Sequence, residues 1–342
     1  AALRSSALRA DEDRTCPLAE NFYKKGVHMK LIKNIIFNLI KKRKERFPEL
    51  LSIELSNFCN ADCIMCPRSN LTRKLQNMDF ETLKKVIENC KNQSLKKINL
   101  FWFGDSLCNK NAIDYIRYIR KELPNVKLYL STNAGLLTED KSDAIIKEKL
   151  LDVINFDIDG IKKETYEKIR LKVNYDTVIK NVKYFIELIN KEKIKKPQIR
   201  VTIIKMKPTE NEIDEFIKYW KPLVDKVDVN DYNTWLGTQE DRNLGDTLNK
   251  SQKGKFDFAC IHPWNELVIS ADGKAGLCCL DYDMKAEIGD LKTETIKDIW
   301  QGEKINFYRN KMLNLEYDKI DVCKNCNGFI YQYKKTWAKL QK

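Results

Sequence analysis

Three cysteines within eight residues constrain the fold and chemistry of this chain more than any other feature. Cys59, Cys63 and Cys66 lie in one loop directly after the strand-like segment Leu51–Leu55. A four-iron cluster normally takes four Cys thiolates, so a loop that supplies three leaves one iron free to bind another molecule. The alternative is a zinc loop, which usually pairs its Cys in C-x2-C units and needs four ligands. Soft thiolates suit both metals, so the surrounding sequence has to decide between them.

The length and cysteine content narrow the class of protein. A chain of 342 residues exceeds the usual single-domain size, and an α/β barrel with a small appendage fits this length well. Eleven Cys in one chain indicate a reducing compartment, where clustered thiols bind metal more often than they form disulfides. We therefore expect a cytoplasmic protein. No apolar run approaches the length of a membrane span.

The positive charge is spread rather than concentrated. The chain has 62 Lys+Arg against 49 Asp+Glu, a net charge of +13, and much of this is Lys in helical stretches such as residues 180–196. Dispersed Lys is typical of solvated helix faces. Because the charge forms no basic stripe with interleaved aromatic residues, we do not expect a nucleic-acid partner.

The N-terminal region divides into two parts. Residues 1–28 have no apolar period and precede a His28-Met29 junction, so they are interpreted as a tag or leader, with a fused substrate peptide containing Cys16 as the alternative. Residues 29–48 have apolar positions at helical spacing followed by the basic run 41–44, which predicts an amphipathic basic helix. Such a helix packs on the barrel or, as the alternative, makes a peripheral membrane contact.

Short β-rich runs alternate with longer helical runs from residue 49 to residue 240, which predicts parallel βα units. The expected strands are 51–55, 98–103, 127–131, 153–158, 199–204 and 227–229. The expected helices are 80–90, 112–122, 141–149, 162–170, 178–191 and 212–220. Six such units form a partial (β/α)6 TIM barrel, whose functional residues are expected at the carboxyl ends of the strands.

The C-x3-C-x2-C spacing, with Phe58 before the first Cys and Ile64-Met65 before the last, resembles the signature of the radical S-adenosylmethionine (SAM) enzymes. In that family the amino and carboxylate groups of SAM bind the open iron of a [4Fe-4S] cluster. One electron then cleaves SAM to a 5′-deoxyadenosyl radical that takes a hydrogen atom from the substrate. The resemblance implies the same cofactors for this chain.

The same resemblance implies a cosubstrate site at three later strand ends. Phe103-Gly104-Asp105 stands where the family has a Gly-Gly-Glu-Pro-like run, and the 131–135 segment resembles its Thr-Asn-Gly segment. The run 156–160 with Arg170 resembles its Ser-x-Asp-Gly…Arg pattern, in which Ser and Arg contact the SAM carboxylate; here Asp157 replaces the Ser. The implied cofactor-binding residues are Phe103, Gly104, Asp105, Ser131, Asn133, Asp157 and Arg170.

A second set of cysteines follows in residues 255–332. Asp272-Gly273 between two apolar runs predicts a β-hairpin that brings Cys260 and Cys278 together. With Cys323 and Cys326, four thiolates can complete a zinc or iron–sulfur site. The segment resembles the C-terminal SPASM/twitch domain, which implies one auxiliary [4Fe-4S] cluster. Adjacent strand residues face opposite sides, so Cys279 could replace Cys278 as the ligand. Residues 333–342 are interpreted as a tail.

Together these features predict a radical SAM oxidoreductase that dehydrogenates or rearranges a sugar-like or aminocyclitol-like small molecule. The alternative is maturation of a ribosomal peptide, and a non-catalytic zinc or electron-transfer module is a third hypothesis. A flavodoxin- or ferredoxin-type reductant is the expected partner. Asp105, Asp231 and Tyr232 follow strands and are the candidate catalytic residues, while Trp102 and Trp235 are candidates for lining the cavity.

Overall fold

The structure is a computed structural model that describes residues 46–238 and 259–326 together with Lys42 and Leu244. The chain divides into two units, residues 1–42 and 43–342, and the fold below is that of the second. The amphipathic helix expected in residues 29–48 lies almost entirely outside the described residues.

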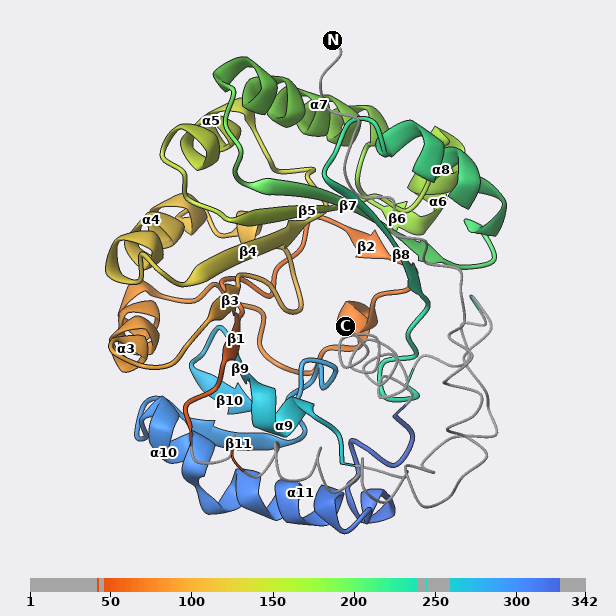
Figure 1. Ribbon diagram of the computed structural model, residues 1–342. Helices are drawn as coiled ribbons and strands as arrows, with labels where there is room; N and C mark the ends of the chain where they lie inside the picture. The colour runs from red at the N-terminus through yellow and green to blue at the C-terminus, as the bar shows by residue number, and fades with distance from the viewer. Residues whose placement is uncertain (1–41, 43–45, 239–243, 245–258, 327–342) are drawn as a thin grey trace, which may run out of the picture. The chain divides into compact units, whose positions relative to one another are not determined.

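Six parallel strands form the centre of the fold (Figure 1). Each pairs in parallel with its neighbours in the order β1-β3-β4-β5-β7-β8, which confirms the partial (β/α)6 barrel. Their bounds are β1 Leu50–Ile53, β3 Lys97–Asn99, β4 Lys127–Thr132, β5 Val153–Asp157, β7 Gln198–Lys205 and β8 Lys226–Asp231. The second strand is shorter than expected, because the chain leaves the sheet after Asn99 and turns toward the cysteine loop.

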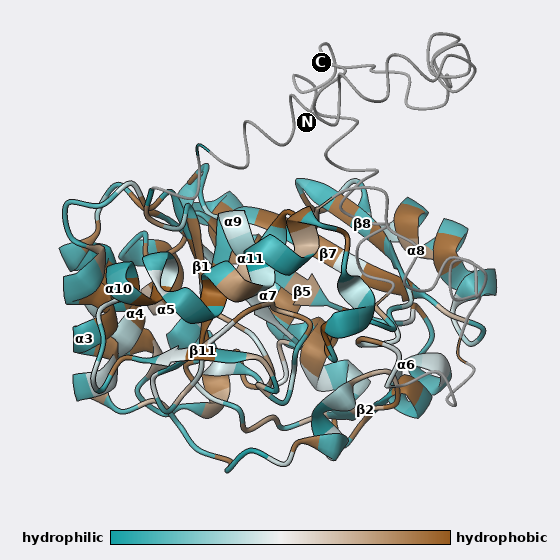
Figure 2. Ribbon diagram, turned by 90° about the horizontal axis from the view of Figure 1, so that it is seen from below, coloured by the Kyte–Doolittle hydropathy of each residue, from teal (hydrophilic) through white to brown (hydrophobic). Residues whose placement is uncertain are grey.

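Helices cover the outer side of this curved sheet (Figure 1). They are α3 Phe80–Cys90, α4 Ala112–Glu122, α5 Glu139–Lys147, α6 Lys163–Ile169, α7 Tyr175–Glu192 and α8 Ile213–Trp220. The first begins at Asp79, whose carboxylate accepts a hydrogen bond from Thr82 N and so satisfies one free amide of the first turn. Figure 2 shows apolar and polar residues on opposite sides of several of these helices, as expected for helices packed on a sheet.

The C-terminal segment extends the same sheet at its β1 edge. Strand β9 (Glu266–Ile269) pairs in parallel with β1, and β10 (Lys274–Gly276) and β11 (Glu287–Asp290) continue the sheet in antiparallel fashion. Strands β9 and β10 form the expected hairpin, with Gly273 at φ +84° in its turn. Three short helices complete the segment: α9 His262–Asn265, α10 Ile296–Gln301 and α11 Glu303–Leu313.

The two faces of the parallel sheet have opposite chemistry. The face under the helices is apolar, and its side chains, such as Leu51, Leu130, Phe156 and Val201, are fully buried. Since in-register parallel partners point to the same side, the other face carries a polar row across neighbouring strands. This inner row includes Ser52, Asn99, Ser131, Asn155, Asp157 and Thr202. Interiors of closed TIM barrels are filled mainly by Val, Ile and Leu, so this polar face differs from a purely structural core.

A short antiparallel pair fixes the cysteine loop over the open end of the barrel. Strand β2 (Asp62–Cys63) pairs with β6 (Arg170–Leu171), and Ile64 N donates to Ile169 O at 2.9 Å. The pair joins a loop after the first strand to a segment after α6. It therefore holds Arg170 beside Cys63.

Candidate active site and auxiliary cluster site

A cavity of about 210 Å³ lies at the carboxyl ends of the parallel strands. All three loop cysteines and all seven expected cofactor-binding residues line it. The other lining residues are Ala61, Asp62, Met65, Arg68, Trp102, Thr132, Ile204 and Trp235. The structure thus brings together residues that are far apart in the sequence, such as Met65 and Trp235, which are 170 positions apart.

The loop thiols lie in a low-polarity environment. Burial raises the pKa of Cys59 and of Cys63 to about 12, and the charges of Cys59, Cys63 and Cys66 disfavour one another. Ala61 N contacts Cys59 Sγ at 3.4 Å, and Arg170 Nη1 contacts Cys63 Sγ at 3.7 Å. Donors of this kind near cluster sulfurs tune the reduction potential of iron–sulfur centres.

The donor set fits an iron–sulfur cluster with one open position. Three half-buried thiolates that repel one another need positive charge, which the irons of a cluster supply. Among the described residues that line the cavity, Cys59, Cys63 and Cys66 are the only cysteines. A cluster held there would therefore lack a fourth Cys ligand, as the spacing indicates.

Gly104 allows the loop after β3 to pack against the cysteine loop. Its φ is +118°, and a Cβ at this position would lie 2.4 Å from Ser56 O and 2.7 Å from Phe58 O. Asp105 N donates to Phe58 O at 2.8 Å in the same contact. A side chain at Gly104 would force the two loops apart, so glycine is required here for both backbone conformation and space.

Asp105 organises the loops around it. Its carboxylate accepts from Leu107 N, Thr132 Oγ1 and Asn133 N at 2.9, 2.7 and 3.1 Å. Burial raises its pKa, although these hydrogen bonds oppose the effect. Asn133 in turn donates from Nδ2 to Asn60 Oδ1 at 2.9 Å and lies 3.8 Å from Cys59 Sγ. Asp105 thereby holds Asn133 next to a loop cysteine.

Arg170 is a buried cation with its own counter-ion. It forms a two-point contact with Asp159, with Nε and Nη2 at 2.9 and 2.7 Å from Oδ2. Asp159 also accepts from Ile204 N at 2.7 Å. Asp157 lies nearby and instead accepts from Ser131 Oγ at 2.7 Å and from Asn155 Nδ2 at 2.8 Å.

We predict that Arg170→Met destabilises the protein by about 3–5 kcal/mol, because it leaves Asp159 buried without a compensating charge. Urea unfolding monitored by circular dichroism measures the change. Arg117→Met is the matched control: Arg117 pairs with Asp114 and Glu148 on the surface, and its loss should cost less than about 1 kcal/mol. Equal stabilities of the two variants would contradict the prediction.

The three candidate catalytic residues do not have the geometry expected of them. Asp231 is exposed, and Tyr232 is buried against Met65, Ile169 and Met206; neither lines the cavity. Asp105 lines it, but three donors already occupy its carboxylate. A position at the end of a strand does not reveal where the side chain points, so the sequence could not distinguish these three residues from Asp157 or Arg170.

Two tryptophans line the cavity, and each donates a hydrogen bond to another segment. Trp235 Nε1 donates to Met65 O at 2.8 Å, and Trp102 Nε1 donates to Cys279 O at 2.7 Å. Phe103 lies between them in edge-to-face contact with each ring. These contacts hold the active-site loops against the C-terminal segment.

A buried ion pair also joins the barrel to the C-terminal segment, and the sequence did not predict it. Glu54, buried after β1, accepts two hydrogen bonds from Arg73 at 2.9 Å each and a third from Ala271 N at 3.1 Å. Arg73 also lies over the ring of Trp102 at 4.5 Å and donates to Tyr282 O at 3.0 Å. The only feature of the sequence that indicated this pair is the charged residue Glu54 at the end of an apolar strand.

The four C-terminal cysteines form a second thiol cluster. Burial raises the pKa of both Cys260 and Cys323. The charges of Cys278 and Cys326 also raise the pKa of Cys260. The pKa of Cys323 is raised in the same way by the charges of the other three cysteines. Four half-buried thiols whose charges interact provide a complete ligand set for a metal or cluster.

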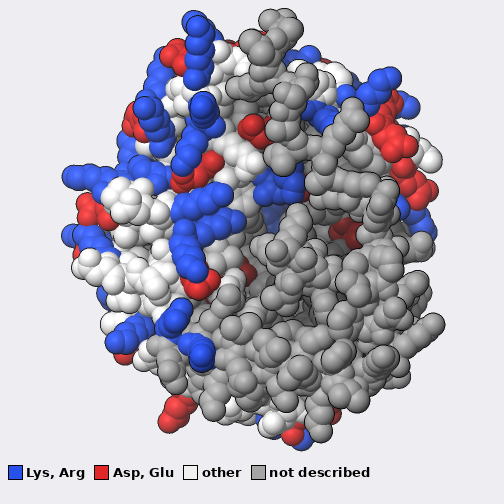
Figure 3. Space-filling view, in the orientation of Figure 1, with Lys and Arg blue, Asp and Glu red and all other residues white. Residues whose placement is uncertain are grey.

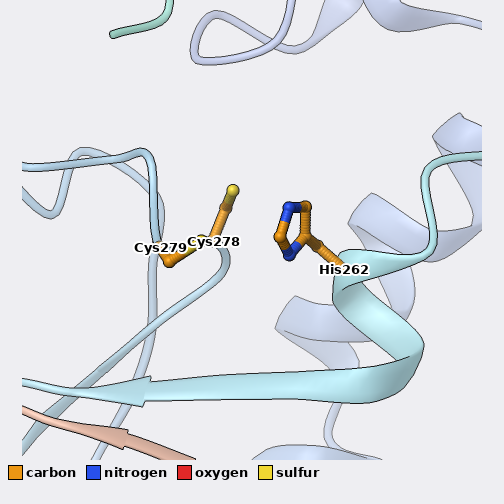
Figure 4. Close-up of side chains that lie close together, drawn as sticks. All are labelled: His262, Cys278 and Cys279. Carbon is orange, nitrogen blue, oxygen red and sulfur yellow. The ribbon is translucent and has the colours of Figure 1, made fainter. Parts of the chain in front are cut away.

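Cys278 lies beside Cys279 and His262 at the edge of this cluster (Figure 4). One ligand atom from each of the three residues lies within 4.8 Å of the others. A hydrogen bond from Cys279 lowers the pKa of Cys278 to about 7, and the charge of His262 acts in the same direction. Burial would lower the pKa of His262, but Cys278 and Glu266 raise it to about 9. The charge of Cys278 acts on both Cys260 and Cys323, so we take Cys278 as the fourth member of the cluster.

A parallel half-barrel whose first strand leads into three buried cysteines, next to a cavity and a second thiol cluster, defines an iron–sulfur enzyme with an open cluster position. The radical SAM superfamily model matches residues 53–219, and the SPASM iron–sulfur cluster-binding domain model matches residues 260–327. The chain belongs to the radical SAM superfamily and has a SPASM domain. Its cofactors are accordingly SAM and [4Fe-4S] clusters, one at the SAM site and one auxiliary.

Known relatives resemble the chain over most of its length. The SAM-dependent 2-deoxy-scyllo-inosamine dehydrogenase of Niallia circulans is 22% identical over 83% of this chain and 94% of its own length. The crystal structure of BtrN with AdoMet and 2-DOIA has a TM-score of 0.57 at 18% identity, covering 82% of this chain and 94% of BtrN. Streptococcus suis SuiB bound to its precursor peptide SuiA has a TM-score of 0.62 at 15% identity, covering 94% and 80%.

The described residues contain no helix that is long and apolar enough to cross a membrane. Figure 3 shows Lys and Arg side chains interspersed with acidic ones over the described part of the visible face.

Proposed function

We propose that this protein oxidises a hydroxyl group of a small polyol, such as an aminocyclitol or a sugar, to a carbonyl. The observation that carries the proposal is the polar inner face of the barrel. Asn99 donates to Ser52 at 3.2 Å, Asn155 donates to Ser131 at 2.9 Å, and Thr202 donates to Asn155 at 2.7 Å. Of this row, Ser131 and Asp157 line the cavity, where a ligand with several hydroxyl groups can exchange hydrogen bonds with them.

The activity named for the Niallia circulans relative, oxidation of 2-deoxy-scyllo-inosamine, is of the proposed chemical class.

The residues of the chain would have the following roles in this reaction. Cys59, Cys63 and Cys66 would hold the first cluster, and Cys260, Cys278, Cys323 and Cys326 the auxiliary cluster. Bound SAM and its cluster supply the radical that takes a hydrogen atom from carbon. Asp105 and Gly104 position the loops that enclose the cavity, while Trp102, Phe103 and Trp235 restrict the access of water.

We further assign residues 49–240 to the barrel and 255–332 to the auxiliary-cluster segment, and we propose a flavodoxin- or ferredoxin-type reductant. Maturation of a peptide is the second candidate function. It is supported by the likeness in fold to SuiB, which covers 94% of this chain.

The test is incubation of the anaerobically reconstituted protein with SAM, reductant and 2-deoxy-scyllo-inosamine deuterated at its carbinol carbons. We expect deuterium in 5′-deoxyadenosine and an equal amount of ketone, both measured by mass spectrometry. Formation of 5′-deoxyadenosine without deuterium, with this probe and with a panel of deuterated sugars, would contradict polyol oxidation and favour the peptide alternative.

A further inference from the structure

Trp102 contacts both the cavity and the auxiliary-cluster segment. It follows β3, lines the cavity and donates from Nε1 to Cys279 O at 2.7 Å, although the two residues are 177 positions apart. Cys279 is the neighbour of Cys278, which is assigned above to the second thiol cluster. One indole ring therefore joins the space in which a substrate would be oxidised to the backbone beside a cluster ligand.

The Trp102 ring is held in place from several sides. The guanidinium of Arg73 lies over the ring, 4.5 Å from its centroid, and Phe103 contacts the ring edge to face at 5.2 Å between centroids. Arg73 is itself fixed by two hydrogen bonds of 2.9 Å to Glu54 and by one of 3.0 Å to Tyr282 O. Because the ring is supported in this way, its hydrogen bond to the C-terminal segment keeps a defined geometry.

The proposed oxidation leaves one electron on the substrate after hydrogen abstraction, and this electron has to cross protein. The four cysteines of the second thiol cluster are not among the described residues that line the cavity. Electrons tunnel faster along covalent and hydrogen bonds than across van der Waals gaps, because bonds couple the orbitals of donor and acceptor more strongly. A bonded path from the cavity to the second thiol cluster therefore favours the transfer.

We propose that Trp102 is the residue through which this electron passes from the substrate radical to the auxiliary cluster. The path runs from the indole ring through its N–H to Cys279 O, and then along the backbone to the thiolate of Cys278. The inference rests on the proposed function and adds to it the route between the two sites.

Oxidation of the substrate radical releases one electron and one proton. Transfer of a hydrogen atom to the 5′-deoxyadenosyl radical leaves the unpaired electron at the carbinol carbon. The hydroxyl proton then passes to water, the electron passes through Trp102 to the oxidised [4Fe-4S] cluster, and the C=O bond forms. Trp102 itself undergoes no net change.

The charge of Arg73 favours transfer across Trp102 without oxidation of the ring. A cation over an indole face attracts the π electrons of the ring, so it makes the removal of an electron from the ring harder. The ring therefore couples the substrate radical to the cluster and does not become a radical itself.

Another hydrogen-bonded chain joins the barrel to the second thiol cluster, but it begins outside the cavity. Ser52 Oγ donates to Glu266 Oε1 at 2.6 Å, and Glu266 Oε2 lies 3.1 Å from His262 Nδ1. His262 in turn lies beside Cys278. Ser52, Glu266 and His262 are not among the described residues that line the cavity, whereas Trp102 is. A substrate in the cavity can therefore contact Trp102 directly.

The test is Trp102→Phe in the anaerobically reconstituted enzyme, with SAM, reductant and deuterated 2-deoxy-scyllo-inosamine as the probe. The variant keeps an aromatic ring and loses the N–H. Freeze-quench electron paramagnetic resonance follows the substrate radical and the reduced auxiliary cluster, and mass spectrometry follows 5′-deoxyadenosine and ketone. A redox titration measures the potential of the auxiliary cluster.

We expect Trp102→Phe to separate hydrogen abstraction from electron transfer. SAM affinity and the rate of deuterium transfer should stay within about threefold of the native values, whereas cluster reduction and ketone formation should slow at least about tenfold. The substrate radical should accumulate, and 5′-deoxyadenosine should exceed ketone. The potential of the auxiliary cluster should not change, because its ligands are retained.

Trp235→Phe is the matched comparison. Trp235 also lines the cavity, contacts Phe103 and donates to a carbonyl, but its acceptor, Met65 O, belongs to the first cysteine loop. This variant should keep 5′-deoxyadenosine and ketone equal, whatever its effect on their common rate. Trp220→Phe controls for the substitution itself, because the Nε1 of Trp220 is buried on α8 without a partner among the described residues. Both of its rates should stay within about twofold of native.

Replacement of Trp102 by 3-benzothienylalanine provides a second variant. It keeps the bicyclic shape and removes only the N–H, so it should also slow cluster reduction. Native cluster reduction in both Trp102 variants would overturn the inference and leave the proposed function intact. Parallel loss of deuterium transfer and ketone would mean that Trp102 only shapes the cavity, and an equal separation of products in Trp235→Phe would remove the specific route; either result overturns the inference. Absence of deuterium transfer in the unmodified enzyme would instead refute the proposed function, and the route with it.

Discussion

Replacement of Cys63 by Ala is expected to abolish SAM cleavage, lowering 5′-deoxyadenosine formation at least about 1,000-fold, or ~4 kcal/mol in activation free energy. Cys63 belongs to β2, whose pairing with β6 fixes the loop, and its thiol contacts Arg170 at 3.7 Å. Two remaining thiolates cannot hold a four-iron cluster in this orientation. Iron analysis should show a decrease from about eight to about four atoms per chain.

Cys90→Ala is the matched control for this change. Cys90 is buried on α3 and contacts Val86 O, away from both thiol clusters. It should retain the full iron content and the native rate of SAM cleavage. Native cleavage by Cys63→Ala would mean that the loop does not hold the cosubstrate's cluster, and the assignment of the cavity would be wrong.

Replacement of Cys323 by Ala is expected to separate SAM cleavage from product formation. The charges of Cys260, Cys278 and Cys326 act on Cys323, which lies outside the cavity that contains the first cysteine loop. The variant should lose about four irons, keep 5′-deoxyadenosine formation within about threefold and form at least about 100-fold less ketone. The cluster that these cysteines would hold would accept the electron that remains on the substrate after hydrogen abstraction, so its loss should stop the reaction before the ketone.

The measurement pairs iron analysis with both products in one reaction, and the Cys63→Ala variant provides the opposite pattern. If Cys323→Ala makes ketone at the native rate, the C-terminal thiols have a structural role only. If it loses SAM cleavage completely, the segment is required for the integrity of the first site, and the separation of roles proposed above is incorrect.

Much of the fold could be predicted because its signals are local. The helices 80–90 and 112–122 have apolar residues at a spacing that only a helix places on one face, and the structure gives the same bounds. Parallel strands follow from the alternation of such helices with short β-rich runs. Asp272-Gly273 likewise identified the β9–β10 hairpin, because its turn chemistry is contained in two residues.

The sequence alone determined which thiols are available and how they are grouped, because the identity of the ligands and the short spacings between them are properties of a single segment. Only the tertiary structure decided how charges and donors are shared around the cavity. Arg170 forms an ion pair with Asp159, Asp105 accepts from Thr132, and Asp157 accepts from Ser131. These relations arise between strands and loops that pairing of β2 with β6 and of β1 with β9 brings together. Because a side chain's pKa and accessibility depend on such distant neighbours, they follow from the folded geometry and not from position along the chain.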